Sequence, residues 1–403
     1  MKTTWQTKKL SEVCDIGAGN SAPQKKEYFI DGIYPFFRTA DVGRVKISKS
    51  LNQVSDYLND EGIKKLKLFK KGTILLPKSG ASTFLNHRVV MGVDGYVVSH
   101  LATIKTDEKI LNNNFLFYFL QEIKAQDLIQ DHKYPSLNLS VIGQIKIPLP
   151  SLSEQLRIVK ILDEVFENIK NAKENTEKNL QNAKDLFESY LQSVFANPGN
   201  DWEEKRLGEV CDFVRGPFGG SLKKSIFKKE GYVVYEQQHA IYNQFTKVRY
   251  FIDEKKFNEM KRFELKSGDL IMSCSGTMGK IAIAPDDIKR GIINQALLKL
   301  SPSKNLLNVF LKNWMESGVF QDDLKTYTKG AAIKNVVSVK ILKGIKILVP
   351  KIQEQKTIVA NLSALSGETK KLEAIYKQKL ADLEELKKSV LKKVFNGDLQ
   401  QSV

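Results

Sequence analysis

Two long segments with the apolar pattern of a helix constrain the fold of this chain more than any other feature. The first covers residues 147–195, contains no glycine, and has prolines only at its start. The second covers residues 347–395, so that Glu154 and Gln155 recur there at a constant offset. A repeat of this length indicates that one structural plan is used twice.

Apolar residues recur in these segments at alternating steps of four and three, as at Ile158, Leu162 and Val165. This spacing predicts helices that pack along one seam as a coiled coil, each on the order of 65 Å long. The first helix leads from the first body to the second, and the second helix starts from the second body. If the two helices pack along each other, the second must run back, so we expect the pair to be antiparallel. The seam weakens at residues 173–179, and Gly367 interrupts the second copy, which predicts a kink or a helix start at these places.

The sequence that precedes each helix is also repeated, with Cys14 matching Cys211 in similar surroundings. In both copies, short β-branched and aromatic runs alternate with glycine turns, and an amphipathic helix is predicted at 112–130 and at 306–324. We therefore expect an α+β fold in which two similar bodies, related by pseudo-two-fold symmetry, are separated by two long antiparallel coiled-coil helices. The predicted regions are a first body at 1–149, a central helical spacer at 150–198, a second body at 199–349 and a distal helical region at 350–403.

The charge of the chain is +17 and is concentrated in the two bodies. Residues 1–150 hold 21 Lys and Arg against 14 Asp and Glu, and residues 201–350 hold 26 against 17. Residues 151–200 are slightly acidic, with 6 against 8. Positive charge on the bodies rather than on the spacer favours a polyanionic ligand that the bodies bind.

Several functional classes are disfavoured by what the sequence lacks. It has no apolar run of about 18 residues, so we expect no membrane span. The start of the chain lacks the apolar core of a signal peptide, so we expect a cytoplasmic protein. The three cysteines form no C-x-x-C pair and the four histidines have no metal-ligand spacing, so we expect reduced core thiols and no metal site.

The sequence contains no catalytic motif in the context that its chemistry requires. Gly17 to Ala22 matches G-x-G-x-x-A, but no helix pattern follows it, so the dinucleotide-binding interpretation fails. The chain has no G-x-S-x-G, no H-E-x-x-H and none of the Asp/Asn-Pro-Pro-aromatic motifs of amino-methyltransferases. The sequence therefore predicts a binding protein and not an enzyme.

The candidate ligand-facing residues lie in loops that mix basic, amide and hydroxyl side chains. Arg reads guanine and Gln reads adenine, whereas Lys contacts phosphates. Residues 38–42 align with residues 237–241, so different side chains at matching positions suit two different half-sites. The predicted DNA-binding residues are Lys25, Arg38, Lys78, Ser79, His87, Arg88, Lys133, Arg215, Lys223, Lys224, Gln237, Gln238, His239, Ser275, Thr277, Lys329 and Lys334.

With these features together, the chain resembles the specificity subunits of type I restriction–modification systems over nearly its whole length. The most specific marks are the two P-x-x-x-E-Q helix entries, followed by the loops at 79–82 and 275–283 and the segment 327–350. The resemblance implies that the bodies are target-recognition domains, each binding one half of a bipartite, asymmetric double-stranded DNA sequence. The helical and partner-binding residues would include Glu154, Gln155, Glu354 and Gln355.

The resemblance also implies a non-catalytic subunit with several partners. The helices would fix the gap between half-sites and dock two methyltransferase subunits, and motor-nuclease subunits would join the complex. The chain itself would bind no cofactor, while S-adenosylmethionine, ATP and Mg²⁺ would bind to the partner subunits. Two alternatives stay open: the equivalent subunit of a system with fused nuclease and methylase, and a coiled-coil tether whose bodies bind protein.

Overall fold

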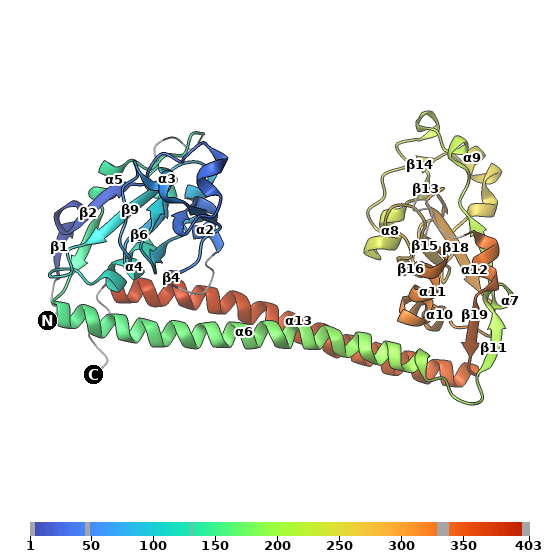
Figure 1. Ribbon diagram of the computed structural model, residues 1–403. Helices are drawn as coiled ribbons and strands as arrows, with labels where there is room; N and C mark the ends of the chain where they lie inside the picture. The colour runs from blue at the N-terminus through green and yellow to red at the C-terminus, as the bar shows by residue number, and fades with distance from the viewer. Residues whose placement is uncertain (1–4, 45–48, 130, 132, 329–337, 397–403) are drawn as a thin grey trace. The chain divides into compact units, whose positions relative to one another are not determined.

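The computed structural model describes residues 5–44, 49–129, 131, 133–328 and 338–396 (Figure 1). Its contacts divide the chain into two compact units. The first unit combines Met1–Lys178 with Lys377–Val403, and the second is Asn179–Tyr376. Each long helix is therefore shared, because its two halves belong to different units.

The first unit contains two small sheets and a terminal strand pair. The larger sheet is mainly antiparallel and has the order β2 (Cys14–Ala18), β9 (Leu101–Thr106), β6 (Ile74–Pro77), β7 (Val89–Met91) and β4 (Ser50–Leu51). The smaller sheet has the order β5 (Asp56–Leu58), β3 (Tyr34–Phe37) and β8 (Tyr96–Val97). The strand pair joins β1 (Gln6–Lys9) to β10 (Lys146–Leu149) in antiparallel register, directly before the long helix.

Short helices connect these strands. They are α1 (Leu10–Val13), α2 (Thr39–Arg44), α3 (Asp60–Ile63), α4 (Asn113–Glu122) and α5 (Leu139–Gly143), with 3₁₀ turns at η1 (Lys26–Phe29), η2 (Ala81–Leu85) and η3 (Ala125–Asp127). The predicted helix at 112–130 is too long, since α4 ends where Ile123 becomes extended.

The second unit repeats this topology. Its larger sheet has the order β12 (Cys211–Arg215), β18 (Leu297–Pro302), β15 (Leu270–Ser273) and β16 (Ile281–Ile283), and its smaller sheet has the order β14 (Phe251–Ile252), β13 (Tyr232–Tyr235) and β17 (Gly291–Ile293). β11 (Glu203–Arg206) pairs with β19 (Lys346–Val349) as β1 pairs with β10. Apart from the pairing of β4 with β7, which has no counterpart among the described residues of the second unit, the same pairings occur in both units. The expectation of an α+β plan used twice is confirmed.

The helices of the second unit are also short. They are α7 (Leu207–Val210), α8 (Gln237–Tyr242), α9 (Glu254–Glu259), α10 (Asn308–Glu316), α11 (Gly318–Thr328) and α12 (Val339–Gly344), with 3₁₀ turns at η4 (Gly219–Ser221), η5 (Lys224–Ile226) and η6 (Lys261–Phe263). The helix predicted at 306–324 is divided, because Ser317 between α10 and α11 is extended and its buried hydroxyl donates to the Trp314 carbonyl at 2.7 Å.

The long helices α6 (Leu152–Ala196) and α13 (Ile352–Phe395) are each continuous. The predicted helix start at residues 173–179 or at Gly367 is therefore wrong. Gly367 is exposed, and a glycine within a helix lowers helix stability by only about 1 kcal/mol relative to alanine. The helix-forming residues on either side of it compensate for this loss. Within the first unit, Lys173 pairs with Glu384 at 2.6 Å, while Ile158 shares a core cluster with Leu391. A lower number on α6 thus goes with a higher number on α13, so the helix halves run antiparallel.

The helices are part of each unit's core. In the first unit, Ile158, Leu162 and Leu391 are buried with Phe115 of α4, whose ring lies edge-on to Phe395 at 5.3 Å. The second unit has the matching arrangement, in which Phe195 packs edge-on against Phe310 of α10 at 5.4 Å. Three apolar residues that continue the spacing of four and three in the long segments, Tyr190, Leu372 and Leu386, were also expected in the seam but are exposed. The seam is thus buried mainly where a helix meets the sheet-containing body of a unit.

The repeated glutamines fasten each helix start to its unit. The side-chain NH₂ of Gln155 donates to the carbonyls of Ile110 and Pro150 at 3.0 and 2.9 Å, and its side-chain oxygen accepts from the backbone N–H of Asn112 at 2.7 Å. Gln355 makes the same three bonds, with Leu307 N–H at 2.8 Å and with two carbonyls at 2.9 Å. Both side chains are fully buried, so their assignment to partner binding is corrected: they hold the fold together.

The two acidic residues of the same motif also bond within their own units. Glu154 forms a two-pronged pair with Arg157 at 2.8 Å on each arm. Glu354 accepts a hydrogen bond from the Trp202 indole at 2.8 Å. Their predicted contact with a partner stays a prediction, and any such contact would compete with these bonds.

Candidate nucleic-acid interface

In the first unit, predicted ligand loops meet at one edge of the larger sheet. β2 and β6 end at this edge and β9 begins there, because β9 is antiparallel to both. Lys78 N–H donates to the His100 carbonyl at 2.9 Å, while its own carbonyl accepts from Leu137 N–H at 2.7 Å. Gly80 N–H donates to the Pro135 carbonyl at 2.9 Å. Backbone bonds therefore bring together the loops at 78–88 and 133–138, which lie far apart in the sequence.

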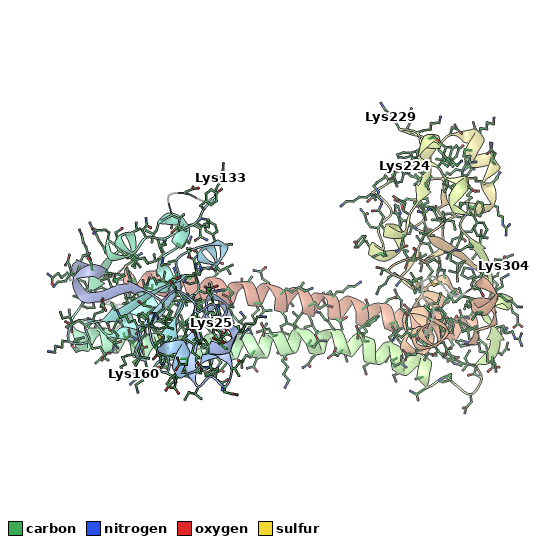
Figure 2. All side chains as sticks on the ribbon, turned by 45° about the horizontal axis from the view of Figure 1, so that its top comes forward. Lys25, Lys133, Lys160, Lys224, Lys229 and Lys304 are labelled. Carbon is green, nitrogen blue, oxygen red and sulfur yellow. The ribbon has the colours of Figure 1, made fainter. Side chains whose placement is uncertain are left out.

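The polar side chains predicted to bind the ligand in this unit differ in exposure. Ser79 Oγ lies 2.7 Å from His100 Nδ1, a partner that the sequence did not indicate. Lys78 and His87 are half-buried. Lys133 is exposed and projects outward in Figure 2. Lys25 is exposed too, and its ammonium lies 3.1 Å from the Glu27 carboxylate.

The matching edge of the second unit gathers a similar set. Arg215 ends β12 and lies beside Cys274, and Gln237 at the start of α8 reaches the Thr277 carbonyl at 3.4 Å. Ser275 and Thr277 are exposed in the loop between β15 and β16. These four predicted residues are therefore neighbours. Gly216 permits this packing, because a Cβ there would lie 1.8 Å from the Asn294 carbonyl oxygen.

Other predicted cations lie in separate segments. Lys223 and Lys224 are exposed around η5, and Figure 2 shows Lys224 projecting outward. Gln238 donates to the Glu236 carboxylate at 3.2 Å and is half-buried. Lys329 and Lys334 lie outside the described residues.

The structure shifts the predicted alignment of the first turn after β3 and β13 by one residue. Each of α2 and α8 begins two residues after its strand, so Arg38 corresponds to Glu236 and not to Gln237. Arg38 pairs with Asp56, whereas Glu236 pairs with Arg249 at 2.8 and 3.0 Å. The two units thus place opposite charges at the same position beside the same sheet edge.

Two predicted DNA contacts are buried and are therefore corrected. Arg88 donates to the Ile123 carbonyl at 2.9 Å, and burial lowers its pKa to about 10. His239 is fully buried, accepting from the Glu236 N–H at 2.9 Å while its other nitrogen lies 3.1 Å from the Lys247 carbonyl. Both side chains stabilise their loops and are not accessible to a ligand in this structure.

Three exposed aromatic residues were missed by the sequence reasoning. Tyr134 is 81% exposed beside Lys133, Phe218 is 89% exposed three residues after Arg215, and Tyr242 is exposed at the end of α8. Large aromatic side chains in positive loops suit stacking on bases or insertion between them. The available signal was an aromatic residue within a basic loop, which sequence alone cannot separate from a core residue.

The thiols and the metal-ligating residue types of the described residues form no reactive or metal-binding group. Burial raises the pKa of the Cys14, Cys211 and Cys274 thiols to about 12, so they remain protonated and unreactive. The described part of the chain contains no cluster of His, Cys, Asp and Glu suited to a metal ion. It also contains no helix long and apolar enough to cross a membrane. The two edges offer cations, amides and hydroxyls, which is the chemistry of binding.

Comparison with known families shows which family the chain belongs to. Residues 2–181 and 199–384 match the model of the type I restriction modification DNA specificity domain. The chain belongs to the type I restriction–modification specificity family. Its two matched segments begin close to the starts of the two repeats, so each recognition domain and most of the helix that follows it form one specificity domain.

Relatives of this specificity subunit are distant but extend over most of its length. The MjaVIII specificity subunit of Methanocaldococcus jannaschii is 24% identical and aligns over 98% of this chain and 93% of its own. The EcoBI specificity subunit of Escherichia coli is 24% identical over 73% of this chain and 68% of its own.

Solved structures share the fold. One chain, from a study of complex assembly and conformational transition in the type I R-M system, has a TM-score of 0.78 at 19% identity and 98% coverage of both chains. The HsdS subunit from Thermoanaerobacter tengcongensis has a TM-score of 0.63 at 18% identity, covering 99% of this chain and 98% of its own.

Proposed function

We propose that this specificity subunit reads a bipartite, asymmetric double-stranded DNA target, with one half-site contacted by each unit. The observation that carries the proposal is the repeated sheet edge with opposite chemistry. At matching positions the first unit presents Arg38 and the second presents Glu236, each held by an ion pair. Arg donates to guanine, while a carboxylate accepts from cytosine, so the two edges suit different base sequences.

The net charge supports the choice of ligand. Each recognition domain is positive, and exposed lysines such as Lys133 in the loop at the first edge and Lys224 in a separate segment suit phosphate contacts. Phosphate contacts position the protein and base contacts give it specificity. We therefore assign the exposed lysines to affinity, and we assign sequence choice to Arg38 in the first unit and to Arg215, Glu236 and Gln237 in the second.

The continuous helices would fix the gap between the half-sites and dock two methyltransferase subunits. Exposed apolar side chains support docking, since Leu156 and Leu386 in the first unit and Leu186 and Ile375 in the second are about half exposed or more. Methylation and cleavage would belong to methyltransferase and motor-nuclease subunits, which would bind S-adenosylmethionine, ATP and Mg²⁺. The described residues of this chain provide binding surfaces for such an assembly.

Selection from randomised duplex DNA tests the proposal, with the full chain and its methyltransferase subunits present. The expected product is one motif of two half-sites with a fixed gap. In a matched experiment Arg38→Ala should relax one half-site by about 1–3 kcal/mol of discrimination and leave the other unchanged. Enrichment of no bipartite motif would refute the proposal, and relaxation of both half-sites would refute the assignment of Arg38.

A further inference from the structure

The second unit contains a pocket of about 670 Å³ where α10 meets α6 and α13. Its walls include the short side chains of Ser363, Ser366 and Asn313, with Phe187 as an apolar surface. Gly367 also lines it, and a Cβ at that position would meet nothing within 4 Å. The pocket is therefore formed by a series of small residues on α13 that face a recognition domain.

The internal repeat shows which side chains occupy the equivalent position in the first unit. Positions on the long helices correspond at an offset of 200, and α4 aligns with α10 because Gln155 and Gln355 bond to their first residues in the same way. The first unit then has Phe166 where the second has Ser366, and Tyr118 where the second has Asn313.

In the first unit, the larger side chains of Phe166 and Tyr118 fill the position that is a pocket in the second unit. The rings of Tyr118 and Phe166 pack edge-to-face at 5.2 Å. Lys387 lies over the Phe166 ring at 5.6 Å, and Lys49 lies over the Tyr118 ring at 4.4 Å. The Tyr118 hydroxyl and the Lys49 ammonium both bond to Asp163. This scaffold thus accepts aromatic rings that are flanked by cations.

We propose that the pocket of the second unit receives an aromatic side chain of a methyltransferase subunit, so that the two units dock their partners differently. This inference rests on the proposed function, which supplies the partner. Lys184, Lys312 and Lys370 line the pocket together with Glu188, Glu316 and Glu373, so a ring bound there would have cations beside it, as in the filled site, and acids as well. The same α13 segment exposes Ile375 at 58%, whereas the first unit has the polar Asn175 at that position.

Filling the pocket with the chain's own residues tests the inference. The double variant Ser366→Phe/Asn313→Tyr copies the first unit, and Gly367→Phe fills the space from a position where a side chain meets no clash. Native mass spectrometry and calorimetry would follow the binding of methyltransferase subunits to the full chain. Each variant should weaken one of two binding steps on the order of 10–100-fold, as expected for losing one buried aromatic side chain.

Ala364→Phe is the matched control, since Ala364 is exposed on the same helix and does not line the pocket. It should bind both subunits as the unchanged chain does. If both pocket variants bind two methyltransferase subunits normally, the inference is wrong while the proposed function stands. If the variants lose only motor-nuclease binding, the occupant is wrong. If the unchanged chain binds no methyltransferase subunit, the docking role itself fails.

Discussion

The position of the boundary between the units allows the role of the helices as a spacer to be tested without disturbing either core. We consider an insertion of four helix-forming residues after Lys178 and another after Tyr376, which are the last residues of each helix before it passes to the other unit. The pair of Lys173 with Glu384 lies within the first unit and is retained. Four residues add about 6 Å of helix, which equals one to two base pairs at about 3.4 Å each.

The gap of the selected DNA motif should therefore lengthen by about one or two base pairs, and both half-site sequences should be unchanged. The measurement is selection from randomised DNA with the methyltransferase subunits present. As a control, the same residues are inserted after Pro198, in the linker to Trp202, whose indole remains bonded to Glu354. The control should keep the original gap. A doubly inserted protein that assembles and still selects the original gap would refute the role of the helices as a spacer.

Three further variants separate stability from recognition. Gln355→Ala should destabilise the protein by about 2–4 kcal/mol, since three hydrogen bonds of about 1 kcal/mol each are lost at a buried site, as measured by denaturant unfolding. Arg88→Met should lower the unfolding midpoint but leave the selected motif unchanged, and an altered motif would contradict its burial. Tyr134→Ala should weaken DNA binding, measured by fluorescence anisotropy, by about 1–3 kcal/mol through the loss of stacking on a base. The free energy of unfolding should not change, because the side chain is exposed. Unaltered DNA binding would exclude the stacking role.

The sequence was sufficient for the elements that depend on periodic pattern. The absence of glycine and proline within the first long segment, and the spacing of residues such as Ile158 and Leu162, predicted the first helix. The expected break at Gly367 failed because a single exposed glycine is a small cost in a helix held by many neighbours. The exposure of Leu372 could not be predicted, since it depends on where a recognition domain covers the helix.

The candidate site was less predictable, because its residues are selected by contacts between distant segments. Arg88 looked like a loop cation, but its guanidinium bonds to the Ile123 carbonyl. His239 looked like a reader of bases, but it closes a turn against Lys247. Lys78 and Leu137 are joined by a backbone bond that no local pattern indicates. Composition could find the basic loops, whereas only the fold shows which side chains within them remain free.

Within each unit, stability and recognition depend on different places. The repeated residues, such as Gln155 with Gln355 and Phe195 with Phe395, lie at the helix entries and in the cores, where a change leaves polar groups unpaired or creates a cavity. The residues that differ, such as Arg38 and Glu236, lie at the edge of a sheet. Each is one member of an ion pair, but Arg38 is the cation of its pair and Glu236 is the anion. A substitution at the edge therefore costs the fold little. Such an arrangement allows one scaffold to acquire two different specificities, since the bonds that hold each unit together place almost no constraint on the side chains offered to the ligand.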